Sequence, residues 1–107
     1  MATIRPYTLI YDTKVRRHLA RIERKYHSLI RKKIEESLTG DPDREIRNRK
    51  PLSRPSVLGT AWELRCGPDN RFRVFYRVSR ELRQVYILAI GVKERSRVLI
   101  GGEEFDL

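Results

Sequence analysis

Arginines alternate with apolar residues in the second half of this chain of 107 residues. Residues 71–78 read RFRVFYRV, in which every second position is taken by Arg71, Arg73, Phe75 and Arg77. Alternate side chains of a β-strand share one face of the sheet, and the other positions of this run are aromatic or aliphatic. The pattern therefore predicts a two-faced strand, apolar on one side and rich in guanidinium groups on the other. A surface of that kind suits the phosphate backbone of a nucleic acid.

Two further segments of the same half have sequence patterns typical of strands. Residues 61–66 alternate between an apolar face and a polar face that carries Glu63 and Arg65. The sequence GPDN at residues 67–70 predicts a tight turn that joins this strand to the arginine-rich one. Residues 85–90 are apolar throughout, as expected of a strand with neighbours on both sides. Together these strands predict an antiparallel sheet.

The first half of the chain predicts one short strand followed by helices. Residues 7–11 are β-prone, and apolar residues then recur at helical spacing over residues 15–26 and, with a shifted phase, over residues 29–38. We expect two helices joined by a tight turn at residues 26–28, with one bent helix as the alternative. The sequence GDP at residues 40–42 predicts where the helical region ends. The outer helical face is basic, which is typical of a solvated surface and also suits a nucleic-acid backbone.

Residues 41–60 form a connector rich in proline, serine, glycine and arginine, without periodicity. We expect a loop, in which a helical turn around residues 43–49 is an option, and loops of this length in compact domains are often functional. With the strands and helices above, the chain is predicted to be a single α+β domain over residues 1–107. Its N-terminal strand and two-helix hairpin would pack on one face of a small antiparallel sheet, in the order β-α-α-β-β-β.

Charge and cysteine content narrow the functional classes. The chain has 24 lysines and arginines against 14 aspartates and glutamates, and this net charge of +10 favours a polyanionic partner, either nucleic acid or an acidic protein. The lone Cys66 excludes an internal disulfide and a cysteine-rich metal site, and we expect a buried thiol there. We find neither a membrane-spanning apolar run nor a signal-like N-terminus, so we expect a cytoplasmic protein.

Four fragments, taken in their order along the chain, resemble the RelE/ParE superfamily of toxins from bacterial type II toxin–antitoxin systems, and RelE-like members in particular. They are KPL at residues 50–52, WELR at 62–65, FRVFY at 72–76 and GVKERS at 91–96. The resemblance extends over nearly the whole chain and implies a fold of two helices against a small antiparallel sheet. RelE-like members cleave messenger RNA in the ribosomal A site, ParE-like members inhibit DNA gyrase, and an antitoxin neutralises both.

The resemblance implies a toxin that inhibits translation as a ribosome-dependent, metal-independent mRNA endoribonuclease, an mRNA interferase. Its partners would be a cognate antitoxin, the ribosome and mRNA, with no small-molecule cofactor, no metal and no membrane. Two alternatives stay open: a ParE-type toxin that inhibits DNA gyrase without cutting RNA, and a toxin-fold protein that has lost its chemistry and only binds. In all three cases we expect an acidic, amphipathic antitoxin segment to lie across the sheet or the helices.

Metal-free RNA cleavage requires a proton acceptor for the ribose 2′-hydroxyl, a proton donor for the 5′ leaving oxygen, and cations for the charge that develops on the phosphate. By resemblance, Arg73 and Arg65 match basic strand positions of the family, and Lys93 matches the basic position after its last strand. Glu63 falls where some members carry a lysine proposed as the base. On the same grounds the RNA backbone would be bound by Lys50, Arg71, Arg77 and Arg95.

The sequence departs from the family pattern at the proton donor. Leu99 takes the position of a catalytic tyrosine, and neither histidine lies nearby in the sequence. Glu63 beside two arginines is expected to stay ionised, which makes it a weak base and an equally good structural ion-pair partner. Tyr76 is predicted on the apolar face, and the placement of Tyr86 stays open. The acidic tail, residues 103–107, is expected to pack back near the basic face.

Overall fold

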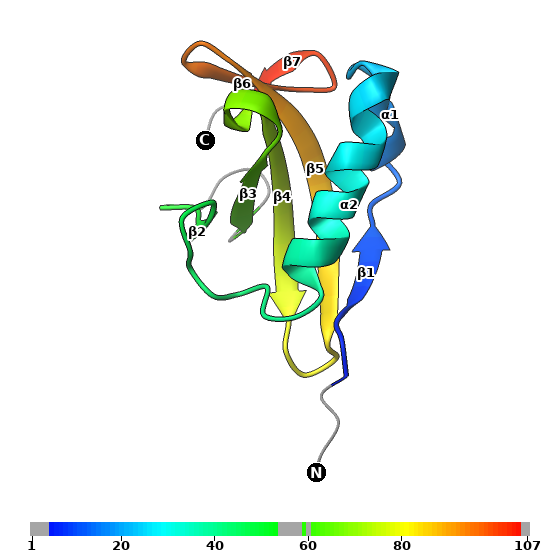
Figure 1. Ribbon diagram of the computed structural model, residues 1–107, viewed down its shortest axis with the longest axis vertical. Helices are drawn as coiled ribbons and strands as arrows, with labels where there is room; N and C mark the ends of the chain where they lie inside the picture. The colour runs from blue at the N-terminus through cyan, green and yellow to red at the C-terminus, as the bar shows by residue number, and fades with distance from the viewer. Residues whose placement is uncertain (1–4, 54–58, 60, 106–107) are drawn as a thin grey trace.

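The structure is a computed structural model that describes residues 5–53, 59 and 61–105 (Figure 1). Its strands are β1 Thr8–Tyr11, β2 Arg49–Pro51, β3 Trp62–Cys66, β4 Phe72–Ser79, β5 Gln84–Glu94, β6 Arg97–Ile100 and β7 Glu103–Phe105. Its α-helices are α1 Val15–Ala20 and α2 His27–Leu38, and short 3₁₀ turns span Arg24–Tyr26 and Pro68–Asn70. The predicted α+β class, with helices against a small antiparallel sheet, is confirmed.

One sheet of seven strands contains every described strand, and six of them follow the antiparallel order β2-β3-β4-β5-β6-β7. β1 lies outside this path and runs parallel to the first part of β5, with Leu9 opposite Val85 and Tyr11 opposite Ile87. The turn predicted at residues 67–70 joins β3 to β4, as expected. The sheet therefore brings the two arginine-bearing strands of the sequence side by side.

Three strands lie where the sequence predicted none. β2 is inside the connector that we expected to be a loop, and residues 43–49 contain turns and a single β-bridge rather than a helical turn. β2 is tied to α2 by Arg49, whose buried side chain donates a hydrogen bond to the carbonyl of Ser37. β6 and β7 follow β5, and the tight turn between β6 and β7 is formed by Gly101 and Gly102, with φ angles of +62° and +86°.

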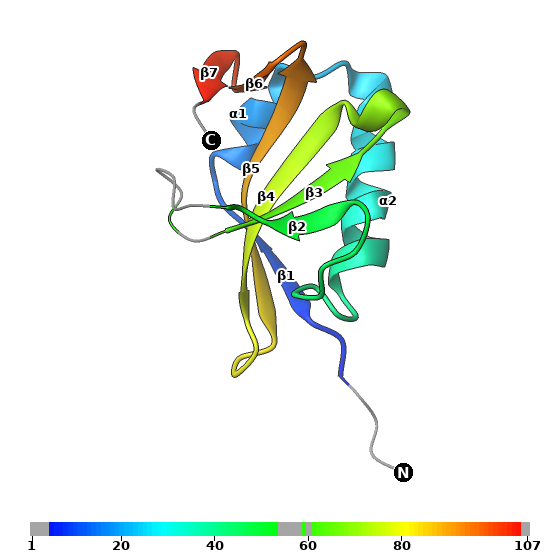
Figure 2. The ribbon, with the colours of Figure 1, turned by 90° about the vertical axis from the view of Figure 1, so that its left-hand side faces the viewer.

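Both helices pack on the same face of the sheet, as predicted (Figures 1 and 2). The break between them comes earlier than the predicted turn at residues 26–28, since α1 ends at Ala20 and a 3₁₀ turn precedes α2. Ile22 in this link is buried, and its carbonyl oxygen lies 2.9 Å from Nε2 of His27, so the link turns into the core. Within the described residues, neither helix combines the length and apolar character needed to cross a bilayer.

The core lies between the sheet and the helices, where the apolar faces predicted for β3 and β4 pack against α2. Tyr76 is fully buried, and its hydroxyl donates a hydrogen bond of 2.7 Å to the carbonyl of Pro42. Burial raises the pKa of this hydroxyl well above its ordinary value, so Tyr76 is structural. Cys66 is buried, as expected, and burial raises the pKa of its thiol to about 11, which keeps the thiol protonated and unreactive.

Candidate functional site

The face of the sheet turned away from the helices, hereafter the open face, is apolar at its centre rather than uniformly rich in arginine. Phe75 is fully buried there, although no helix covers it. It is covered by Phe105 of β7, whose ring centroid lies 6.0 Å away although β7 is three strands from β4 in the sheet order. The sheet therefore curls over its own open face. The apolar cluster that results comprises Phe75, Ala89, Val98, Leu52 and Ile100.

Beside this cluster, one carboxylate holds two guanidinium groups. Oε1 of Glu63 accepts a hydrogen bond from Nε of Arg65 at 2.8 Å and another from Nη1 of Arg73 at 3.1 Å. The three residues, hereafter the Glu63 triad, lie on adjacent strands, with Arg65 directly opposite Arg73. Arg65 keeps 39% of its side chain exposed, whereas Arg73 and Glu63 keep only 6% and 8%. A ligand on the open face would therefore meet Arg65, with Glu63 and Arg73 behind it.

Arg73 is held by the surrounding backbone as well as by Glu63. Its Nε donates a hydrogen bond of 3.1 Å to the carbonyl of Asn70 in the turn that precedes β4. On the other side it faces Gly91 of β5, where a Cβ would lie only 2.9 Å from Cγ1 of Val98. The sequence placed Arg73 on this face as a phosphate contact, and the structure places it there as a buried, anchored cation.

Three more of the site residues expected from the sequence surround the triad. Lys50 in β2 is exposed and directly opposite Glu63. Lys93 in β5 is exposed two residues beyond the position that faces Arg73, and its backbone N–H donates a hydrogen bond of 2.7 Å to the carbonyl of Arg71. Arg71 is half-buried, with its guanidinium carbon 5.7 Å from the centroid of the Phe72 ring. The structure thus gathers a cationic rim at one end of the open face.

The other two expected site residues lie apart from this rim. Arg77 is exposed on the open face, four residues along β4 from Arg73, a separation of about 13 Å along an extended strand. Arg95 is exposed in the turn between β5 and β6, with a φ of +58°. Neither makes an ion pair within the part of the chain that the structure describes. They can contribute to the field of the face, but they are not part of the triad.

Leu99, which the resemblance sets at the position of a catalytic tyrosine, does not face this site. Leu99 pairs with Val92 and lines a small hollow on the helix side of the sheet, together with His18 of α1 and Arg21, the residue that follows this helix. Tyr86, whose placement the sequence left open, lies in β5 opposite Arg77, and its hydroxyl donates a hydrogen bond to the side chain of Gln84. Among the described residues, no tyrosine or histidine hydrogen-bonds to the Glu63 triad.

The C-terminal strand contributes a residue that sequence reasoning missed. We expected the acidic tail to pack back, and β7 does so. Oε2 of Glu104 lies 4.0 Å from Nη1 of Arg97 in β6. Residues 106–107 lie outside the described part of the chain. The unexpected member is Phe105, which meets Phe75 on the open face. The available signal was an aromatic residue just after a Gly-Gly turn in an otherwise acidic segment.

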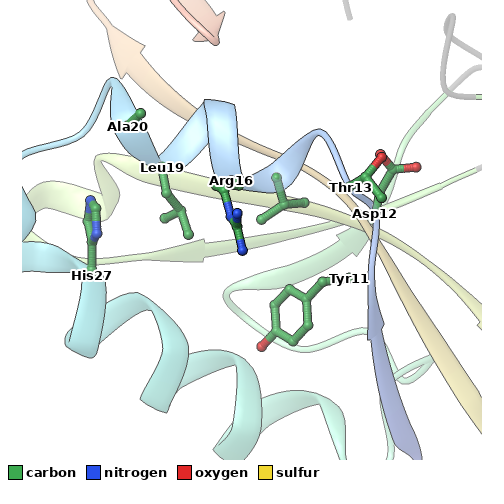
Figure 3. Close-up of a pocket in the computed structure, with 8 residues that line it drawn as sticks. Tyr11, Asp12, Thr13, Arg16, Leu19, Ala20 and His27 are labelled. Atoms are coloured by element: carbon green, nitrogen blue, oxygen red, sulfur yellow. The ribbon is translucent and has the colours of Figure 1, made fainter.

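A separate groove, hereafter the helix groove, lies on the other side of the molecule between β1, α1 and α2. It combines a hollow of about 790 Å³ with a second of about 400 Å³, and the two share Tyr11, Leu19 and His27. Figure 3 shows Tyr11 and Arg16 both projecting into the space between the helices. Partial burial raises the pKa of the Tyr11 hydroxyl, and nearby Glu35 adds to this effect. Mainly apolar walls of this kind are the type of surface into which proteins bind the apolar face of an amphipathic segment.

Comparison with known proteins finds a solved structure with a similar fold. No family model matches the chain, and the comparison with curated proteins gives no match. Among solved structures, the chain is similar to a chain of the RelBE2 toxin–antitoxin complex from Mycobacterium tuberculosis, with a TM-score of 0.63 and 27% sequence identity. The match covers 82% of this chain and 99% of that chain. The similarity therefore extends over the whole of the neighbour, and not over one shared motif.

Proposed function

We propose that this chain, which is RelE-like, is the toxin of a toxin–antitoxin pair, and that it acts as a ribosome-dependent mRNA endoribonuclease. The structural neighbour from the RelBE2 complex supports the toxin role and a protein antitoxin as partner. The nuclease assignment rests on one observation, the Glu63 triad within a cationic rim on the open face. Fixed guanidinium groups of this kind stabilise the charge that develops on a phosphate under attack.

In the proposed reaction the ribose 2′-oxygen attacks the adjacent phosphorus, the bond to the 5′-oxygen breaks, and a 2′,3′-cyclic phosphate forms. Arg65 contacts the phosphate, because it is the exposed guanidinium of the triad. Glu63 is a positioning residue, because its Oε1 accepts hydrogen bonds from both guanidinium groups and so fixes their places. Protons then move through solvent, and the chemical step is expected to be about 10²- to 10⁴-fold slower than with a positioned acid or base.

Replacing Arg65 by glutamine is expected to reduce mRNA cleavage by about 10²- to 10³-fold, the usual cost of removing one fixed donor to a developing charge. The measurement is primer extension on a reporter mRNA in a reconstituted translation reaction, with and without ribosomes. Arg17→Gln is the matched control, since it removes an exposed arginine from α1, on the side of the sheet opposite the triad. Cleavage that survives in Arg65→Gln but falls in Arg17→Gln would contradict the assignment.

The lack of a positioned proton donor at the triad favours a second candidate, the ParE-type toxin that inhibits DNA gyrase. Leu99 faces the helices, and among the described residues no tyrosine or histidine hydrogen-bonds to the triad. A toxin that acts by binding alone needs no proton donor. A wild-type protein that leaves mRNA intact on ribosomes but blocks DNA supercoiling by purified gyrase would replace the nuclease proposal. A protein inert in both reactions would be the toxin-fold binding protein.

We place the antitoxin segment in the helix groove. The groove is lined by two arginines, Arg16 and Arg31, and by two carboxylates, Asp12 and Glu35, between mainly apolar walls. An amphipathic segment therefore complements it chiefly through apolar side chains, with acidic residues placed beside the two arginines. Leu19→Glu puts a carboxylate on the apolar wall that both hollows share, and is expected to weaken the antitoxin complex by at least about tenfold. Calorimetric titration with the isolated antitoxin checks this. Leu82→Glu, at a hairpin position that is 65% exposed, is the control and should change nothing.

A further inference from the structure

The open face carries an aromatic pair whose position the nuclease proposal does not use. Phe75 is fully buried and lies directly opposite Glu63 in the β3–β4 ladder. Phe105 packs on it with a centroid distance of 6.0 Å and an angle of 39° between the rings. Phe105 itself is only half-buried, so part of its ring faces solvent. The pair therefore presents an aromatic surface beside the triad.

Cations lie on two sides of Phe105, although its own strand also carries the exposed Glu103 and Glu104. Phe75, which supports it, is the cross-strand neighbour of Glu63 and lies two residues from Arg73 on the same face. In the other direction Phe105 lies opposite Val98, and Val98 lies opposite the exposed Lys93. The cations that a ligand could reach near this ring are Lys93 and, beyond Glu63, Arg65. An aromatic ring with accessible cations nearby is an arrangement by which proteins bind single-stranded RNA, with the phosphates held by the cations and a base stacked on the ring.

We propose that Phe105 is a stacking platform for the RNA base next to the phosphate that Arg65 contacts, and that Phe75 positions its ring. This inference rests on the proposed RNA-binding function. It adds a base-binding site to a face that otherwise recognises only the backbone. Stacking tolerates any base, so the site would strengthen RNA binding without reading its sequence.

The test compares two probes that share a backbone, a fluorescein-labelled RNA octamer of mixed sequence and the octamer of ribose phosphate without bases. Fluorescence anisotropy gives the affinity of the full chain and its variants for each probe. Phe105→Leu keeps an apolar side chain on Phe75 but lacks the π-face, and Phe105→Trp keeps the π-face. We expect Phe105→Leu to weaken binding of the RNA by about tenfold and binding of the baseless probe by less than about twofold, with Phe105→Trp close to wild type.

Three results overturn this inference, and they are distinguishable. Unchanged RNA affinity in Phe105→Leu would show that no base stacks there. Equal losses on both probes would show that Phe105 only supports the fold of the face, which thermal unfolding of the variant would corroborate. A wild-type chain that binds neither probe would overturn the proposed RNA function itself, whereas in the first two results the wild-type chain still binds both probes.

Discussion

Replacing Arg73 by methionine is expected to lower the free energy of unfolding by about 3 kcal/mol, because it leaves the carboxylate of Glu63 buried with only the half-exposed Arg65 as its partner. The side chains of Glu63 and Arg73 keep only 8% and 6% of their surface exposed, so water cannot replace the lost guanidinium. Urea unfolding measures the loss, and Trp62 is a natural reporter since its ring stacks on the buried Tyr76 at a centroid distance of 6.3 Å.

Two further variants separate the buried charge from simple loss of packing. Arg65→Met removes the other partner of Glu63, but from a side chain that is 39% exposed, so it should cost less than about 1 kcal/mol. The double variant Glu63→Leu with Arg73→Met removes the stranded carboxylate as well and should regain most of the loss. If the double variant is no more stable than Arg73→Met, the uncompensated carboxylate is not the cause. The smaller expected loss of stability is also the reason to change Arg65, and not Arg73, in activity assays.

Replacing Gly67 by alanine is expected to cost about 3 kcal/mol of stability and to displace both arginine-bearing strands. Gly67 has a φ of +82° and a ψ of 179°, a region of backbone conformation that is essentially confined to glycine. A Cβ there would also lie 2.8 Å from Cε2 of Phe72, and closer still to Cδ2. Phe72 cannot move aside, because it is buried in the core and packs on Tyr26 at 5.1 Å. Thermal unfolding followed by circular dichroism is the measurement.

Gly40→Ala provides the matched control for this substitution. Gly40 follows α2, and a Cβ at this position would have nothing within 4 Å. The control should change stability by less than about 1 kcal/mol, in either direction. Equal destabilisation by both variants would mean that the loss of a glycine in general, and not the conformation and crowding at the β3–β4 turn, determines the result.

Local patterns in the sequence predicted most of the fold. The two-residue alternation over β3 and β4 assigned their faces correctly, since Leu64 and Val74 are buried in the core while Glu63 and Arg65 meet on the other side. β2, β6 and β7 were missed because each has only three or four residues, too few for a periodicity to show. The helix break was misplaced because Ile22 continues the apolar spacing of α1 while lying in the link beyond it.

The site was harder to predict than the fold, for reasons that lie in tertiary contacts. The sequence placed Arg65 and Arg73 on one face, but it could not show that one oxygen of Glu63 holds both, or that only Arg65 remains accessible. Phe105 escaped notice because its contact with Phe75 depends on the curl of the sheet. Arg77 and Arg95 lie away from the triad because of the length of β4 and the geometry of the turn after β5. Neither feature could be predicted from the alternation of residues in the sequence.

The curl of the sheet also affects the order in which the molecule matures during its own synthesis. The open face needs Phe105 of β7 to cover Phe75 of β4, and β7 is the last described strand to leave the ribosome. Chains fold from the N-terminus as they emerge, so the core between helices and sheet can form while the opposite face is still uncovered. A nascent chain therefore passes through a stage in which the aromatic centre of the open face is exposed, and this stage lasts until β7 has been made and Phe105 can cover Phe75.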